Sequence, residues 1–331
     1  MEKEGVSIII CCYNSSARIS DTLMHLQKIN SHGIYWEVVL VDNASDDDTT
    51  SRAQKIWNEN PVTKLYIVAE PKKGLMNARI KGVQSSSFNI LSFIDDDNWV
   101  ETEWVKKVYS ILHNNTEIAA CGGSSEAVFE TTPPVWFSEF SRSYATGVQQ
   151  NYTGFVQPEK GYLWGAGLTV RKQAWDELFS SGFTSLLPGR SGKALTAGED
   201  SEICLAWVIR GWKLWYDQTL SLKHYIPQPR LTLNYLERMY EGFGKAEMIL
   251  SLYRNHINYD KKDKPGWFFI SVISLSKLVQ TWLANRFSSS EEKVRNMILW
   301  KHQRAYTLEL LFNRKKYMFA KNKINKYFTS V

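Results

Sequence analysis

Three consecutive carboxylates follow an apolar segment in the sequence FIDDDNWV, residues 93–100. Asp95, Asp96 and Asp97 repel one another unless a positive species lies among them. A hard divalent ion such as Mg²⁺ or Mn²⁺ takes oxygen ligands, often one or two protein carboxylates together with substrate phosphates. The cluster therefore predicts a metal ion that bridges to a diphosphate. The alternative is a solvated acidic turn or a cap for the following helix.

A second acidic segment, VDNASDDDTT, covers residues 41–50. Asp42 ends an apolar run and is placed to accept a hydrogen bond from a base or ribose. Residues 46–48 suit the first turn of the next helix, where acids are favoured without a ligand. The sequence contains neither GxGxxG after its first apolar run nor GxxxxGK[ST]. It therefore lacks the signature of a Rossmann dinucleotide site and of a P-loop.

Apolar strand-like segments alternate four times with helix-like segments in about the first 115 residues, which predicts a parallel, doubly wound α/β sheet. The expected strands are 6–14, 36–45, 64–70 and 89–97, and the expected helices are 15–29, 48–57, 74–86 and 101–115. Ligands of such sheets bind beyond the carboxyl ends of the strands. Each strand here ends on polar residues, so we expect the acidic and amide groups to gather at one edge.

The pattern changes after residue 118. We expect a strand at 118–130, a long loop at 130–160, a strand and helix at 161–179, a helix at 198–212 and an extended segment at 213–227. Residues 235–330 are mostly helical in pattern. The expected organisation is an α/β domain at 1–230 and a helical extension at 231–331.

The segments CCYN, VDNASDDDT, GLMNARIKG, FIDDDN and AGEDSEICLAWVIRGWKLWYD resemble, in this order, the motifs of family 2 glycosyltransferases with the GT-A fold. The resemblance covers residues 6–227 and leaves the C-terminal extension out. It implies inverting transfer of a sugar from a nucleotide-diphosphate sugar, most commonly a UDP-sugar, with Mn²⁺ or Mg²⁺ as cofactor.

The resemblance also implies roles for individual residues. Asp97 would bind the metal, and His224 would join it unless it is a structural histidine. The residues implied at the nucleotide sugar are Cys12, Tyr13, Asn14, Asp42, Arg79, Asp95 and Asp96.

Inverting displacement needs a base on the face opposite the leaving group, which takes the proton of the acceptor hydroxyl. By likeness to the family's ED motif, Asp200 would be this base and Glu199 would support it. Both acids also suit the N-terminus of the helix that follows. Gly122 and Gly123 would permit a close approach to the acceptor or sugar, and Trp164 would stack on a sugar unless it belongs to the core.

The net charge is +6, and residues 286–331 carry eleven Lys and Arg against three Glu, a net charge of +8. This tail predicts an anionic partner surface or a merely soluble helical face. No nucleic-acid-binding motif accompanies it. Residues 266–284 form an apolar, amphipathic segment that either packs on the domain or lies in the plane of a membrane.

The four cysteines have no CxxC spacing and lie in apolar segments, which predicts free thiols in a reducing compartment. No secretory signal pattern is present, so we expect a cytoplasmic enzyme, peripheral on the inner face of the cell membrane. The predicted function is sugar transfer to a glycan or lipid-linked glycan in polysaccharide assembly. The alternatives are a polyprenyl-phosphate sugar synthase and a non-catalytic nucleotide-sugar or glycan-binding protein.

Overall fold

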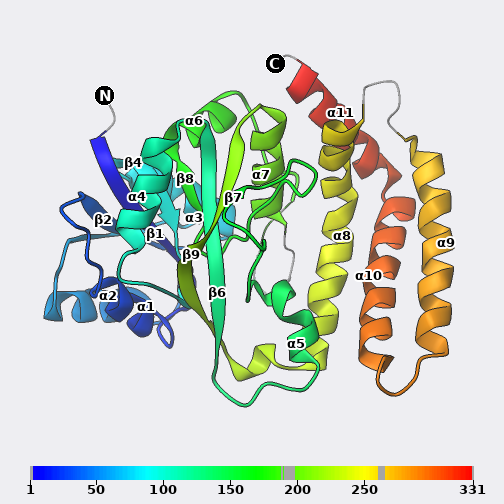
Figure 1. Ribbon diagram of the computed structural model, residues 1–331, viewed down its shortest axis with the longest axis horizontal. Coiled ribbons are helices and arrows are strands. Elements are labelled where there is room, and N and C mark those ends of the chain that lie inside the picture. Colours follow the sequence, from blue (N-terminus) through cyan, green and yellow to red (C-terminus); the bar gives the residue numbers. More distant parts are fainter. Residues whose placement is uncertain (1–2, 188, 190–197, 260–264, 330–331) are drawn as a thin grey trace.

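The computed structural model describes residues 3–187, 189, 198–259 and 265–329. Strands and helices alternate through its first third, as the sequence predicts (Figure 1). These elements are β1 (Lys3–Cys12), α1 (Ile19–Leu26), β2 (Trp36–Asp42), α2 (Thr49–Glu59), β3 (Lys64–Ala69), α3 (Leu75–Ser85), β4 (Phe88–Phe93), β5 (Asn98–Val100) and α4 (Trp104–Asn114).

Strand β1 lies inside the parallel half of the sheet, between β2 and β4, and β3 extends the same half beyond β2. Ile8 and Ile10 pack in a core with α1, α2 and α4, whereas Ile9 packs in a second core with α3. Helices therefore cover both faces of the sheet. This two-sided burial explains why β1 is a continuous apolar run rather than an alternating one.

Residues 118–226 complete a nine-stranded sheet in the order β3-β2-β1-β4-β8-β6-β9-β5, with β7 paired to β9. These residues contain β6 (Ile118–Phe129), β7 (Gly154–Phe155), β8 (Thr169–Arg171), α6 (Lys172–Ser180), α7 (Glu199–Ile209) and β9 (Lys213–Ile226). Strand β8 is antiparallel to β4 and β6, while β6 and β9 are parallel. The predicted α/β sheet with flanking helices is confirmed, and the sheet is mixed beyond β4.

Residues 130–160 are more ordered than the expected loop. They contain α5 (Phe137–Phe140), the 3-10 helix η1 (Ser141–Tyr144) and β7. Phe137, Phe140 and Tyr144 are buried in a small core with Leu236 and Met239 of the first C-terminal helix. The aromatic side chains of this segment thus anchor it, which fixes the backbone that follows η1.

The C-terminal extension is helical, as predicted. It follows η2 (Gln228–Arg230) and consists of α8 (Leu233–Asn258), α9 (Trp267–Arg286), α10 (Lys293–Phe312) and α11 (Arg314–Thr329). Helix α8 stands against the sheet region, α10 packs beside α8, and α9 forms the outer edge (Figure 1). Because Met248 and Tyr253 of α8 share a core with α7 residues, α8 belongs to the wall of the α/β region. The boundary at residue 230 stays a prediction.

The segment that the sequence marks as amphipathic forms α9, and its orientation is unexpected. The buried residues of α9 are Ser271 and Ser274, while most of its large apolar side chains are exposed. The fully buried side chains of α9 thus carry hydroxyl groups, and Trp267 and Ile270 are partly buried beside them, while most of the large apolar side chains face outward.

Candidate active site

A cavity of about 720 Å³ opens where β1 and β4 end and α7 begins. Residues 142–145, residues 162–166 and one face of α8 complete its wall. Most of the site residues predicted from the sequence line it: Cys12, Tyr13, Arg79, Asp95, Asp96, Asp97, Trp164, Glu199, Asp200 and His224. The topology therefore gathers acids from distant segments at one sheet edge, as expected for an α/β fold.

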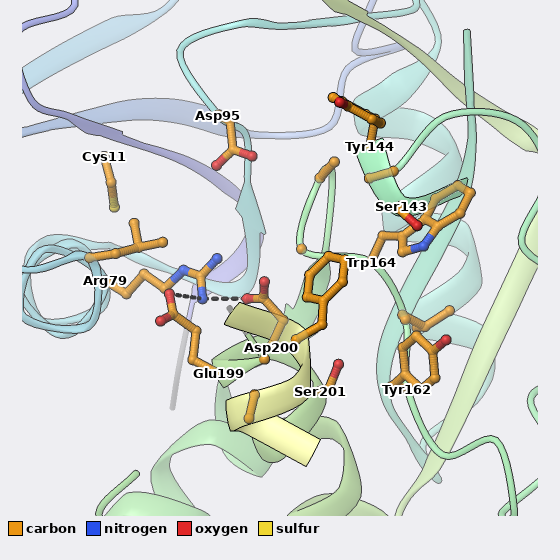
Figure 2. A pocket seen from close by; sticks show the side chains of 18 of the residues that line it. Cys11, Arg79, Asp95, Ser143, Tyr144, Tyr162, Trp164, Glu199, Asp200 and Ser201 are labelled. Carbon is orange, nitrogen blue, oxygen red and sulfur yellow. Dashed lines mark hydrogen bonds and ion pairs between the residues drawn. The ribbon is translucent and has the colours of Figure 1, made fainter. Parts of the chain in front are cut away.

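The three aspartates after β4 take different positions, and two of them have an arginine partner. The carboxylate of Asp95 points into the cavity (Figure 2). Arg18 Nη2 lies 2.7 Å from Asp96 Oδ2, and Arg230 Nη1 lies 3.0 Å from Asp97 Oδ2. The two guanidinium groups offset the repulsion expected from consecutive acids.

Asp96 joins the turn after β4 to the start of α1. Ser15 Oγ donates to its carboxylate, and Thr22 Oγ1 donates to its backbone carbonyl at 2.9 Å. Burial raises the pKa of Asp96, and the neighbouring Asp97 charge adds to this, whereas Arg18 opposes it. Asp96 thus has a positioning role in this turn, and its predicted ribose contact stays a prediction.

Asp97 and His224 form the candidate metal site. The antiparallel pairing of β5 with β9 sets Asn98 opposite His224, which brings His224 Nε2 to 3.6 Å from Asp97 Oδ1. Both side chains are buried. A carboxylate is a ligand that Mn²⁺ and Mg²⁺ prefer, and a neutral imidazole is a common ligand of first-row metals, so the pair could hold a divalent ion.

Within the described ranges, no group of three or more His, Cys, Asp and Glu is arranged to hold a metal ion. Arg230 was not predicted, because a single arginine in the segment QPR carries no recognisable signal.

Arg79 connects α3 to both predicted catalytic acids. Its side chain is only 4% exposed, and its guanidinium forms an ion pair with Asp200 Oδ1 and lies 3.5 Å from Glu199 Oε1 (Figure 2). Burial favours a lower pKa for Arg79, but the charges of Asp200 and Glu199 outweigh it and raise the pKa above its ordinary value. Arg79 therefore stays cationic. The sequence placed it at the nucleotide, and that contact remains a prediction.

Two glycines allow this arrangement at the start of α7. Gly198 precedes the helix with a φ of 108°, a left-handed conformation that favours glycine. A Cβ on Gly165 would lie 2.1 Å from Asp200 Oδ2, so the backbone of residue 165 directly borders the carboxylate. Neither glycine was predicted as a site residue. Residue 165 approaches α7 only through the fold, because the two are far apart in the sequence, so no local pattern signals the contact.

Trp164 lies on the cavity wall rather than in the core. Its indole borders the cavity on the side of Ser143, Tyr144 and Tyr162 (Figure 2). Its backbone N–H donates to Gln149 Oε1 at 3.0 Å, which fixes the loop that carries it. This position is compatible with stacking on a sugar, which stays a prediction.

The loops after β1 and β3 form the outer wall. Lys73 Nζ donates to Tyr13 Oη at 3.1 Å and lies 4.6 Å from the centroid of the Tyr13 ring. Asn43 also lines the cavity, and its Oδ1 accepts from the Gly74 N–H at 2.7 Å. Asn43 therefore organises the loop before α3, a role that the sequence did not reveal.

Cys12 is a buried thiol, and burial raises its pKa well above the ordinary value. All four cysteines are free, as predicted. Asp42 and Asn14 are described by the structure but lie outside the cavity wall. Asp42 Oδ1 accepts from the Ser45 N–H at 3.2 Å, and Asn14 Oδ1 accepts from the Asp46 N–H at 2.8 Å. Their predicted contacts with the nucleotide stay predictions.

Gly122 and Gly123 do not lie where we expected them. They belong to β6, and neither borders the cavity among the described residues. A Cβ on Gly123 would lie 1.7 Å from the Leu220 carbonyl oxygen, because the pairing of β6 with β9 shifts register beside it. Strand packing therefore accounts for a glycine at residue 123, and the predicted contact with an acceptor or sugar stays a prediction.

A family model described as "Glycosyl transferase family 2" matches residues 7–179. The chain is similar to the glycosyltransferase named EpsH of Bacillus subtilis (strain 168), with 23% identity over 166 residues that cover 50% of this chain and 46% of EpsH. It is also similar to the glucosyl-dolichyl phosphate glucuronosyltransferase of Haloferax volcanii, with 20% identity over 250 residues, 74% of this chain and 77% of that protein.

Among solved structures, the chain resembles the mannosyltransferase PcManGT from Pyrobaculum calidifontis, solved with GDP-Man and Mn²⁺. The TM-score is 0.54 at 15% identity, and the alignment covers 98% of this chain and 87% of PcManGT. At this identity the likeness shows the fold alone.

Proposed function

Since the chain belongs to glycosyltransferase family 2 and has the GT-A fold, we propose that it is a metal-dependent, inverting enzyme that uses a nucleotide-diphosphate sugar. The acceptor is a hydroxyl of a glycan or lipid-linked glycan in polysaccharide assembly. The observation that carries the proposal is the pairing of Asp200 with buried Arg79 on the same cavity as Asp97 and His224. One cavity would thus hold both the proposed base and the proposed diphosphate-binding end.

Asp200 is the proposed general base. As the acceptor oxygen bonds to the anomeric carbon, Asp200 takes the hydroxyl proton, and the bond from that carbon to the diphosphate oxygen breaks on the opposite face. Arg79 holds one carboxylate oxygen of Asp200, which fixes the orientation of the other. Glu199 supports Arg79 from the same helical turn.

Asp97 and His224 are the proposed residues for Mn²⁺ or Mg²⁺. When bound, the ion neutralises charge that builds on the departing diphosphate. Arg230, beside Asp97, supplies a further positive charge from the chain itself. Cys12, Tyr13, Asn14, Asp42 and the Asp95–Asp96 pair are proposed around the nucleotide, and Trp164 is proposed against a sugar ring.

The donor is proposed to be a UDP-sugar. The test measures nucleoside diphosphate release from UDP-, GDP- and dTDP-sugars, with Mn²⁺ and with EDTA. We expect metal-dependent release that is fastest with a UDP-sugar. Absence of both binding and release for every donor would overturn the enzyme function, whereas release from a GDP-sugar alone would correct only the donor.

A lipid-linked acceptor is supported by the name of the Haloferax relative, which acts on a dolichyl phosphate glucoside according to that name. We therefore propose that the enzyme works on the cytoplasmic side of the cell membrane. A polyprenyl-phosphate sugar synthase would have a phosphate as its acceptor and would need less base catalysis. Near-complete loss of transfer in Asp200→Asn, with donor binding retained, distinguishes a hydroxyl acceptor from a phosphate acceptor.

A further inference from the structure

Helix α9 presents its apolar side to solvent. Phe268 is 74% exposed and Phe287 just beyond the helix is 78% exposed. Further exposed apolar side chains on α9 are Phe269, Val272, Ile273, Leu275, Val279, Trp282 and Leu283. A single exposed apolar residue needs no explanation, but a whole helical face of them indicates an interaction surface.

The opposite side of α9 packs inward, and its fully buried residues are Ser271 and Ser274, with Trp267 and Ile270 partly buried beside them. The Ser274 and Thr307 hydroxyl oxygens lie 2.7 Å apart, and Gln303 Nε2 donates to Ser274 Oγ at 3.1 Å. A helix on the surface of a water-soluble domain has the reverse arrangement, with its apolar side inward. Contacts through small and hydroxyl-bearing residues are instead typical of helices whose outer side meets lipid. Lipid tails are as apolar as the side chains, so no hydrophobic effect drives apolar side chains into the contact between helices.

Within the part of the chain that the structure describes, α9 is the one helix long and apolar enough to cross a membrane. However, α10 runs back along α9 and carries several charges, including Lys301 and Arg304 (Figure 1). If α9 crossed the bilayer, these charges would enter the hydrocarbon layer at high cost. The packing therefore favours a helix that lies along the membrane surface.

The charged residues around the exposed face of α9 indicate which lipid headgroup charge it would favour. Helix α9 contains Lys277 and Arg286 and no acidic residue. The guanidinium of Arg314 lies 4.7 Å from the centroid of the Trp267 ring, at the other end of the helix. Apolar side chains with flanking cations match an anionic lipid surface, and the long Lys277 side chain can extend to the headgroups.

We propose that the outward face of α9 inserts into the headgroup region of an anionic bilayer, with the helix in the membrane plane. The attachment thus depends on this apolar face, and the basic tail adds attraction to it. The inference is independent of the donor and of the catalytic assignments.

The test compares two triple variants of the full chain that remove apolar side chains without changing charge. One carries Phe268→Ser, Val272→Ser and Val279→Ser on α9. The matched control carries Tyr35→Ser, Val62→Ser and Val135→Ser, which are exposed positions away from α9. Binding is measured by cosedimentation with vesicles of phosphatidylcholine and phosphatidylglycerol at a ratio of about 3:1, and with phosphatidylcholine alone.

We expect wild type and control to bind the anionic vesicles alike, and the α9 variant to bind at least about tenfold more weakly. Binding of wild type should be weaker to neutral vesicles. Circular dichroism shows whether each variant is folded, and donor hydrolysis in solution reports the enzyme separately. Equal binding by a folded α9 variant would overturn the proposal. So would a wild-type dimer in ultracentrifugation that becomes monomeric in the α9 variant without a change in vesicle binding.

Discussion

The guanidinium of Arg79 on α3 is ion-paired with the carboxylate of Asp200 on α7, and almost all of the arginine is buried. Helix α3 follows the loop that Asn43 organises, and α7 packs on α8. The pair thus joins the proposed nucleotide side of the cavity to its proposed catalytic side. Its charge balance also includes Glu199, which lies within reach of the same guanidinium.

Asp200→Asn tests the proposed base. The amide keeps the size of the carboxylate but cannot take a proton, so we expect kcat to fall by about 10²–10⁴-fold. Donor affinity, measured by calorimetry with Mn²⁺ present, should change by less than about threefold. Asp176→Asn on α6, outside the cavity wall, is the matched control. A kcat of Asp200→Asn equal to that of the control would exclude Asp200 as the base.

Arg79→Met tests the buried cation. The change leaves Asp200 and Glu199 close together without a counter-charge, so we expect a loss of about 3–5 kcal/mol in the free energy of unfolding. Arg79→Lys restores the charge and should recover part of this loss. Urea denaturation measures both variants. Equal stability of Arg79→Met and wild type would mean that the pair contributes nothing to the fold.

Gly165→Ala tests the close contact behind the base. Its Cβ would lie 2.1 Å from Asp200 Oδ2, so the carboxylate must move. A misplaced catalytic group typically costs about 10²-fold, and we expect this loss in kcat. Gly122→Ala is the control, because its Cβ would meet Leu163 at an ordinary 3.5 Å. If Gly165→Ala and Gly122→Ala keep the same kcat, the position of Asp200 does not depend on residue 165.

The sequence predicts the first half of the fold well, because its signals are local. The apolar run Ile8–Ile10 is typical of a strand that is buried on both sides of the sheet. A glycine precedes the helix between Leu75 and Ser85. The topology then places Asp95 and Cys12 at one edge. By contrast, the antiparallel β8 and the mixed pairing beyond β4 depend on contacts between distant segments, for which a single sequence carries no signal.

The same contrast between local signals and contacts of distant segments holds for the residues of the cavity. Asp97 and Asp200 were predictable because they stand in short motifs that the family resemblance identifies. Arg230, Asn43 and Gly165 were not, because each acts through a partner far away in the chain. At Gly123 the sequence signals a close approach but does not say what approaches, and the structure shows that the backbone of Leu220 does.

Asp97→Asn tests the proposed metal site. The amide is a weaker ligand than the carboxylate, so we expect Mn²⁺-dependent donor binding to weaken by about 10–100-fold. The exposed acid Asp48 gives the control Asp48→Asn, which removes the same charge without touching the cavity. Calorimetric titration of the donor at several Mn²⁺ concentrations measures the effect. If donor binding by Asp97→Asn depends on Mn²⁺ as it does in wild type, Asp97 is not a metal ligand.

Glu202 on α7 is a fully buried carboxylate outside the cavity wall. It accepts hydrogen bonds from Ser185 Oγ at 2.5 Å, Leu187 N–H at 3.0 Å and Tyr253 Oη at 2.8 Å. Glu202 therefore joins α7 to Tyr253 of α8 and to residues 185–187, which precede α7 in the chain. Burial raises the pKa of Glu202, and the donated hydrogen bonds only partly oppose this.

This raised pKa predicts a pH dependence of stability. Above the ordinary glutamate pKa, the unfolded chain has released its proton while the folded chain still holds it, so the unfolded state binds fewer protons. The free energy of unfolding therefore falls as pH rises through this window. Glu202→Gln cannot titrate, so its stability should fall less steeply than that of wild type over the same range. The free energy of unfolding of Glu202→Gln should also be lower by a constant amount at every pH. The side-chain NH₂ of the glutamine would face backbone N–H donors in place of a carboxylate oxygen that accepts from them.

Urea denaturation of wild type, Glu202→Gln and the exposed control Glu291→Gln, in steps from pH 4.5 upward, measures this difference. The control should parallel wild type, because Glu291 is exposed at the surface. Subtraction of the two curves removes the contribution of every other titrating group. If Glu202→Gln also parallels wild type, the carboxylate is ionised in the fold across the whole range, and the hydrogen bonds from residues 185–187 and Tyr253 outweigh its burial.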